Sequence, residues 1–412
     1  MLEAVGVLAG FITLAILLAL RLPIWIVLTA TAAVTSIVIG GVENLVNITL
    51  ITTTDMSTLN LLAVTFLIMF FVNLYKITGY IDRLGNELVK ALKRPKIVLI
   101  LVPAILGLLP VAGGALMSAP VVDSVGTSMG LERDKRLFIN VWYRHVIFLF
   151  YPISSVIILT AALGRTTVWE IAYRQLPVAA VMIIVGFILG LRERKGKAHA
   201  ALLVTDAPNF KVLIKTLAPI IVAVLVSLST SSLVRNIFGA SFQPLSIAIG
   251  ILFALLLLVM LSKPSIYGLV KAIMNRGSIE LVLAAYGAML LRMAFTKADI
   301  GGIISGMMGG STNPALLAMA LPAGLAFATG TSLGSIAISL SILPSITHLT
   351  PSLTALVYAS SFSGYLASPL HLCYIYTAQY LRIPFTAGYR YMIPAIVALL
   401  AAAYGVYILT PS

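Results

Sequence analysis

Residues that could do chemistry are concentrated where long apolar stretches are interrupted. In the segment LLPVAGGALMSAPVVDSVG, residues 108–126, prolines, a glycine pair, serines and Asp123 break a run otherwise apolar enough to cross a bilayer. The segment ATGTSLGS, residues 328–335, breaks a second run. Unpaired backbone inside a bilayer is tolerated only where it is buried in protein or lines a wet cavity. We therefore expect two re-entrant hairpins, over about 96–129 and 313–345, whose glycine-containing tips allow backbone to approach a ligand closely.

Two long apolar spans, 137–163 and 352–380, are interrupted by Pro152 and Pro369. Proline removes a helical hydrogen bond and frees carbonyls, so each span predicts two half-helices, although an ordinary proline kink is the alternative. Four half-helix N-termini that meet the hairpin tips would offer N–H groups and partial positive charge to a small anion. The predicted substrate-binding residues are Ala112, Gly113, Gly114, Ser118, Pro152, Ser154, Ser155, Thr329, Gly330, Thr331, Ser332, Ser335, Ser368, Pro369 and His371.

Asp123 and Arg144 are the charged residues that fall clearly within apolar spans. At the helical rise, Asp123 lies about 15 Å and Arg144 about 12 Å from the predicted level of the breaks, towards the same face. They could form an ion pair that joins the first hairpin to the first broken helix, or Arg144 could contact the substrate. His371 could couple protons or simply pack. We predict no cofactor and no certain metal site, although unwound backbone at Gly113 and Gly330 could hold Na⁺.

The composition defines the class of protein. Of 412 residues, 60% are hydrophobic and 10% charged, against roughly 25% charged in soluble domains. The net charge of +14 does not indicate nucleic-acid binding, because the lysines and arginines lie in short loops between apolar runs. The single cysteine, Cys373, excludes an internal disulfide. We expect an all-α polytopic membrane protein with about ten crossings, at 2–20, 22–40, 59–77, 137–163, 175–192, 212–232, 242–261, 279–296, 352–380 and 389–409.

Charge asymmetry predicts the orientation. If both hairpins return to the side from which they enter, 21 of the lysines and arginines lie on one face and 5 on the other, with Arg144 between them. The positive-inside rule then places both termini outside the plasma (inner) membrane and the linker 193–211 in the cytoplasm. Amphipathic stretches at 81–95 and 297–308 should lie in opposite interfaces, either as arms between moving and fixed parts or as surface helices.

An internal repeat divides the chain at this linker. Residues separated by 217 positions match without a gap: Gly113 with Gly330, Ser118 with Ser335, Pro152 with Pro369. Each half, 1–192 and 212–412, holds five crossings and a hairpin. Because five is odd, the halves enter the membrane from opposite sides, and such an inverted-topology repeat is typical of secondary transporters.

The tips LLPVAGGALMS and ATGTSLGS and the breaks FLFYPISS and YLASPLHL resemble those of the ion transporter superfamily, which includes divalent-anion/sodium symporters and arsenite and gluconate-type permeases. Within it, the chain is most similar to the uncharacterised family numbered 401 among domains of unknown function. The resemblance implies a homodimer that works as an elevator. It implies a scaffold of residues 1–78 and 212–297 and a transport unit of 95–192 and 310–409. The Ser-Asn-Thr tips of the dicarboxylate branch are absent here.

The function that we expect is symport of a small anion, an organic acid or oxyanion, with Na⁺ or H⁺. A Na⁺/H⁺ antiporter is the alternative, but such exchangers usually need a midplane carboxylate and Asp123 is off-centre; a channel is less favoured. We do not expect an enzyme, because the sequence has no H-E-x-x-H motif, no P-loop and no evident base for Cys373. The expected partners are the bilayer, an anionic substrate and a second copy of the chain.

Overall fold

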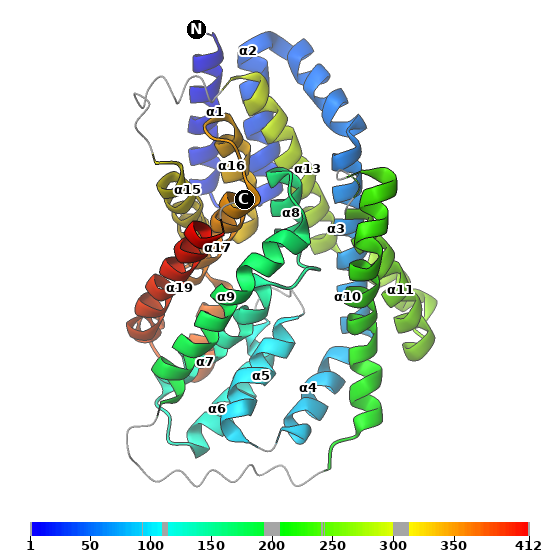
Figure 1. Cartoon of the computed structure of the whole chain (residues 1–412), viewed down its shortest axis with the longest axis vertical. Helices are drawn as coiled ribbons and strands as arrows, with labels where there is room; N and C mark the ends of the chain where they lie inside the picture. Colours follow the sequence, from blue (N-terminus) through cyan, green and yellow to red (C-terminus); the bar gives the residue numbers. More distant parts are fainter. Residues whose placement is uncertain are drawn as a thin grey trace.

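The computed structural model describes residues 2–92, 94–108, 114–192, 207–239, 242, 244–299 and 313–410. Within these ranges the chain is helical, with no β-strand (Figure 1). Eight helical segments there are long and apolar enough to cross a membrane, and they coincide with the eight unbroken crossings predicted from the sequence. The prediction of an all-α polytopic membrane protein is therefore confirmed.

The helices of these segments differ from the predictions mainly in length. The predicted crossing 22–40 ends at a kink, because Gly40 and Gly41 have non-helical backbone angles, yet the helix resumes and continues to Thr54. The segments comprise α1 (Leu2–Ala19), α2 (Ile24–Thr54), α3 (Met56–Ile77), α9 (Val168–Gly186) with a π-helical end (Phe187–Leu191), α10 (Phe210–Phe238), α11 (Pro244–Ser262), α12 (Ile266–Ile273) with α13 (Arg276–Lys297), and α19 (Tyr389–Leu409).

Two pairs of shorter helices occupy the positions of the expected hairpins. The first pair is α5 (Pro95–Gly107) and α6 (Ala115–Ser128), and the second is α15 (Pro314–Thr329) and α16 (Ser332–Ile342). Within each pair the two helices pack against each other. In Figure 1 the first pair lies in the lower half of the molecule and the second in the upper half.

Both broken spans are interrupted at the predicted prolines. α7 (Arg133–Val146) ends in a short 3₁₀ turn, the chain is non-helical around Pro152, and α8 (Ser155–Gly164) follows. In the second half α17 (Pro351–Ala367) ends just before Pro369 and α18 (Leu372–Leu381) begins after it. Because a proline cannot donate to the preceding turn, each break leaves two half-helices whose ends lie inside the molecule.

The helices form two groups by their packing. The first group contains α1, α2, α3 and α10 to α13, and the second contains α5 to α9 and α15 to α19. In the second group the first helix of each hairpin packs on the broken helix of its own half, α5 on α7 and α15 on α17. The second helix of each hairpin packs on the broken helix of the other half, α6 on α18 and α16 on α8. α16 also packs on α13 and α2 of the first group, whereas α6 makes no comparable contact with that group among the described residues.

Side chains of the two halves correspond at the same spacing of 217 residues. Thr160 and Thr377 each donate a hydroxyl hydrogen bond of 2.7 Å to the carbonyl four residues earlier. The half-helices α8 and α18 then end at Arg165 and Arg382, which both have left-handed backbone, with φ of 51° and 55°.

The amphipathic segment predicted at 81–95 forms α4 (Tyr80–Ala91). Its buried face packs against α10 and α3. The carboxylate of Glu87 accepts a 2.6 Å hydrogen bond from the backbone N–H of Asn209 just before α10, which ties the two segments together. Most of the second amphipathic segment, 297–308, lies outside the described residues.

Candidate functional site

A cavity of about 350 Å³ lies where the second hairpin tip meets both helix breaks. Its wall is formed by α7 and the 3₁₀ turn after it, the start of α8 with the residue before it, the tip between α15 and α16 with the start of α16, α17, and α18. The cavity is lined by Arg144, His145, Phe148, Ser154, Val156, Gly330, Thr331, Ser332, Leu333, Tyr358, Phe362, Tyr365, Leu372 and Cys373. The structure thus brings together Arg144 and four of the predicted substrate-binding residues.

The second tip is fixed against the second break. Gly330 ends α15 with a φ of +67°, and a Cβ added to it would lie 2.6 Å from the Cβ of Leu370. Only glycine gives both this left-handed turn and this close approach. The hydroxyl of Ser368 donates a 2.6 Å hydrogen bond to the carbonyl of Phe327, which holds the break against α15.

Four half-helices begin without a side-chain cap. α6 follows Gly114, α8 follows Ser154, α16 follows Thr331 and α18 follows His371, and no side-chain hydrogen bond caps any of these N-termini in the described structure. Side chains cap α3, α9, α10, α12, α13, α15 and α17, whereas α2, α4, α5, α7 and α19 also begin without such a cap. Ser and Thr are strong capping residues, so Ser154 and Thr331 leave unused a bond that they could make. N-terminal N–H groups are therefore left for a ligand, together with the positive end of each helix dipole.

Arg144 places a buried positive charge beside the cavity. Its side chain is 1% exposed, and one guanidinium nitrogen, Nη1, donates a 3.0 Å hydrogen bond to the carbonyl of Leu106 on α5. The same guanidinium interacts with Cys373 and Tyr365. No aspartate or glutamate lines the described cavity wall. A buried cation near helix N-termini, without a carboxylate in the wall, favours an anionic ligand.

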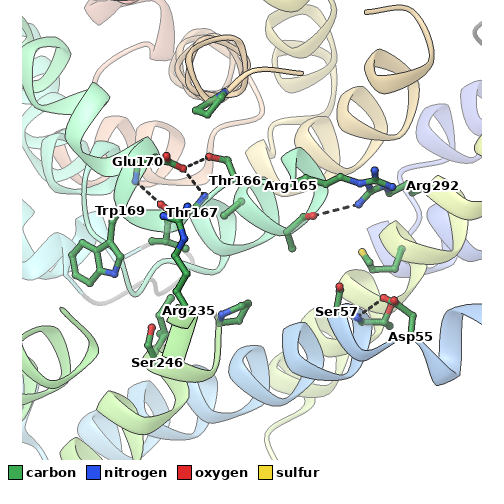
Figure 2. Close-up of a pocket in the computed structure, with 18 of the residues that line it drawn as sticks. Asp55, Ser57, Arg165, Thr166, Thr167, Trp169, Glu170, Arg235, Ser246 and Arg292 are labelled. Carbon is green, nitrogen blue, oxygen red and sulfur yellow. Dashed lines mark hydrogen bonds between the residues drawn. The ribbon is translucent and has the colours of Figure 1, made fainter. Parts of the chain in front are cut away.

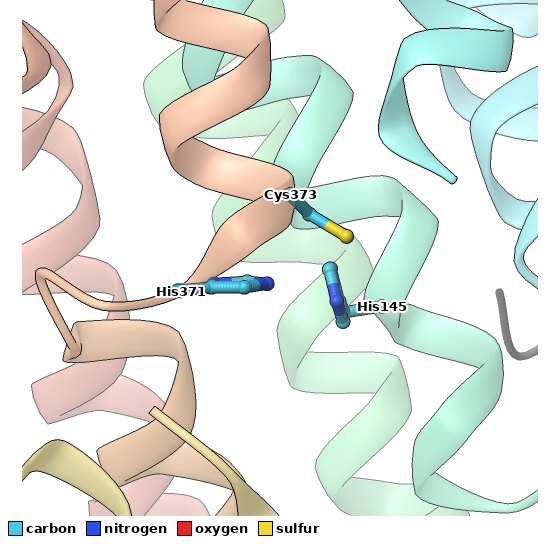
Figure 3. A group of neighbouring side chains, drawn as sticks. All are labelled: His145, His371 and Cys373. Carbon is cyan, nitrogen blue, oxygen red and sulfur yellow. The ribbon is translucent and has the colours of Figure 1, made fainter. Parts of the chain in front are cut away.

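Two histidines and the cysteine converge at one edge of the cavity (Figure 3). The ligand atoms of His145, His371 and Cys373 lie within 4.8 Å of one another, and all three residues are buried. The Nδ1 of His145 lies 2.6 Å from the carbonyl of Val141, which can only accept, so Nδ1 carries the proton and Nε2 faces its neighbours. Neither Nε2 of His145 nor either ring nitrogen of His371 has a hydrogen-bond partner in the described structure.

This set of donors could in principle hold a soft metal ion, because imidazole and thiolate are zinc ligands. The guanidinium of Arg144 next to Cys373 opposes a bound cation, since like charges repel strongly away from water. The same guanidinium attracts an anion. The group is therefore better suited to hydrogen-bond an anion or to carry a proton than to hold a metal.

Comparison with protein families assigns the chain. A family described as "Protein of unknown function (DUF401)" matches residues 4–409. The chain belongs to the DUF401 family. No match was found among curated proteins.

In this DUF401 protein the predicted Asp123–Arg144 pair does not form. Asp123 instead pairs with Arg136, whose guanidinium also donates to the hydroxyl of Thr127. Arg136 precedes Arg144 by about two turns of α7, which brings it to the depth of Asp123 and leaves Arg144 at the cavity.

The remaining predicted residues of the DUF401 site fall into three sets. Ser118, Ser335 and Ser368 donate hydrogen bonds that hold neighbouring segments together, and Thr329 donates one to the carbonyl of Leu325 within α15. Ser155 and His371 are buried beside the cavity and their side chains have no hydrogen-bond partner in the described structure. Pro152 lines a separate, largely apolar cavity and Pro369 is exposed, while Ala112 and Gly113 lie outside the described residues and Gly114 is the buried residue before α6.

Asn140 is a buried polar residue that the sequence did not identify. Its side chain accepts a 2.6 Å hydrogen bond from Ser118 and donates one of 2.9 Å to Thr377, which joins α6, α7 and α18. His145 and Cys373 were also missed as site residues. Their only sequence signal is proximity, because each lies within two residues of a predicted one, Arg144 or His371.

Proposed function

We propose that this DUF401 protein is a secondary active transporter that carries a small anion, an organic acid or an oxyanion, coupled to Na⁺ or H⁺. The observation that carries this proposal is the central cavity, where a buried arginine and uncapped helix N-termini meet and the described wall holds no carboxylate. A site built around broken helices is typical of transporters.

The two groups of helices suggest how the site could move. We assign the first group as the scaffold and the second as a transport unit that slides past it, in the manner of an elevator, within the ion transporter superfamily and as a homodimer. The proposal rests on the hairpins and broken helices all packing within the second group. His145 and His371, with unpartnered ring nitrogens at the cavity edge, are the candidates for proton coupling, and the backbone at Gly330 is a candidate for Na⁺.

The antiporter remains the second candidate, and the structure disfavours it. A cation exchanger needs a titratable carboxylate in its site. The intramembrane carboxylate that the sequence offered, Asp123, is paired with Arg136 and does not line the described cavity.

The first test is the melting temperature of the purified protein in detergent against a panel of carboxylates and oxyanions, each in Na⁺ and in K⁺ at two pH values. A true substrate at 100 times its dissociation constant should stabilise the protein by about 2.7 kcal/mol. Arg144→Gln should abolish this shift, whereas Arg174→Gln, which removes an equal charge from α9 away from the cavity, should retain it. A melting temperature that changes with cations or pH but with no anion would support the antiporter instead.

A second measurement uses the unmodified chain, in case Arg144→Gln fails to fold. Cys373 is the single cysteine and lines the cavity, so a small thiol reagent can report on this site alone. The anion that raises the melting temperature should slow labelling at least several-fold. A labelling rate of Cys373 that no stabilising anion changes would place the binding site elsewhere.

A further inference from the structure

A second and larger cavity lies away from the central one. Its volume is about 680 Å³, and its wall combines α3, α10, α11 and α13 of the first group with the end of α8 and the start of α9 from the second (Figure 2). α8 separates the two cavities: Ser154, before its first residue, lines the central one, and Ala162, near its last, lines this one. Those positions are about 12 Å apart along a helix.

Three arginines from three elements line this cavity, and in Figure 2 Arg165 and Arg292 lie together while Arg235 lies apart from them. Arg165 follows α8 in a left-handed conformation, Arg235 lies in the last turn of α10, and Arg292 lies on α13. Arg292 donates a 3.3 Å hydrogen bond to the carbonyl of Ala162 and is close enough to Arg165 to be repelled by it. Neither Arg165 nor Arg235 forms a side-chain hydrogen bond or an ion pair within the described part of the chain.

The two carboxylates in the same wall already accept hydrogen bonds from groups at helix ends. Asp55 accepts hydrogen bonds from the backbone N–H and the hydroxyl of Thr58, at 2.8 and 3.0 Å, and so caps α3. Glu170 accepts from the hydroxyl of Thr166 at 2.7 Å and the N–H of Thr167 at 3.2 Å, at the start of α9. These bonds fix both carboxylates at helix ends. Asp55 is close enough to attract Arg292, but neither carboxylate forms an ion pair with Arg165 or Arg292 in the described structure.

We propose that this cavity is a second anion site, which binds a small dianion of the sulfate or phosphate type between Arg165 and Arg292. Guanidinium groups pair with the oxygens of such anions through charge-assisted hydrogen bonds, and a dianion relieves the repulsion between neighbouring arginines. The bound anion bridges the two groups of helices, because Arg165 belongs to the second and Arg292 to the first. This proposal stands independently of the anion transport proposed above.

The test is a titration of the purified protein with sodium sulfate, and separately with sodium phosphate, at constant ionic strength set by chloride. The melting temperature of the wild type should rise saturably. In the double variant Arg165→Gln/Arg292→Gln the half-saturating concentration should rise about 100-fold, since two charge-assisted bonds of about 1.5 kcal/mol or more are lost. Arg174→Gln, on the same stretch of chain but outside the cavity, controls for charge and for the general salting effect of sulfate.

The variants separate binding at the second cavity from binding at the central one. Retention of the sulfate response in Arg144→Gln together with its loss in the double variant would establish the second site. Loss in Arg144→Gln with full retention in the double variant would overturn the second site and assign the anion to the central cavity. The absence of any saturable response to sulfate or phosphate in the wild type would overturn the second site as well.

Discussion

Gly330 shows how a single backbone position connects the hairpin tip to the cavity. Its left-handed φ lets α15 stop where Thr331 and Ser332 reach the cavity wall, and its missing side chain lets the tip touch Leu370 at the second break. The counterpart tip in the first half carries Gly113 at the matching position, outside the described residues.

We predict that Gly330→Ala destabilises the protein by about 1–2 kcal/mol from the left-handed backbone alone. A further loss should come from the contact with Leu370, and weakened anion binding should accompany it. Gly324→Ala is the matched control, because an added Cβ meets nothing within 4 Å and alanine is the better helix former. Melting temperatures of both variants, with and without anion, check this. Equal melting temperatures for the two variants would contradict the role assigned to the tip.

At the scale of elements, sequence reasoning succeeded where the signal is local. Apolar length located the unbroken crossings, and Pro152 and Pro369 located both breaks, because each feature lies in the segment that it shapes. It failed where the result depends on how helices pack against one another. Spacing from the breaks predicts that Asp123 lies nearly level with Arg144, but in the structure it lies level with Arg136, about two turns earlier on α7, and pairs with that residue.

The same limit explains the residues that were missed. Asn140 belongs to a run of α7 with no local feature that marks a hydrogen-bond network, and its partners Ser118 and Thr377 come from other helices. The cluster of His145 with Cys373 likewise arises only when α18 packs against α7. Packing of this kind needs coordinates, because one sequence gives neither helix rotation nor helix neighbours.

Glu87 supplies a pH-dependent prediction for the contact between α4 and α10. The hydrogen bond from the backbone of Asn209, followed by that from Lys90, holds the pKa of this carboxyl below its usual value. Because the pKa of Glu87 is lower in the folded than in the unfolded state, its ionised carboxylate stabilises the fold at pH values above 4.5, the pKa in the unfolded chain. This stabilisation is lost as the pH falls through the folded-state pKa.

We therefore expect Glu87→Gln to melt below the wild type at pH 7 and to converge with it as the pH falls below about 4.5. Glu280→Gln, which removes the exposed partner of Arg276, should change little, because such pairs contribute about 0–1 kcal/mol. Melting temperatures over a pH series in detergent give the measurement. A difference between Glu87→Gln and the wild type that is constant with pH would show that the carboxylate charge contributes nothing there.

For the whole molecule, the distribution of positive charge predicts the orientation. From the 21-to-5 asymmetry we expect the C-terminus to lie outside, on the same side as the arginines of the second cavity. Alkaline phosphatase fused after Ser412 should then be active in a bacterial host, and green fluorescent protein at the same place should stay dark. Reporters inserted in the linker 193–211 should behave in the opposite way. The reverse pattern at both places would invert the assignment.

The unequal packing of the two hairpins against the first group of helices bears on the relative energies of two orientations of the site. α16 rests on α13 and α2, while α6 has no comparable support from the first group among the described residues. By chain order in the two halves, the counterparts of α13 and α2 are α3 and α11. If the halves exchange conformations, α6 would gain contacts with α3 and α11 while α16 loses its contacts with α13 and α2. The protein would then have two stable states. Its resting orientation would then be set by the difference between two interfaces made of different side chains, so that substitutions on α13 or α2 could change the populations of the two states without altering the site.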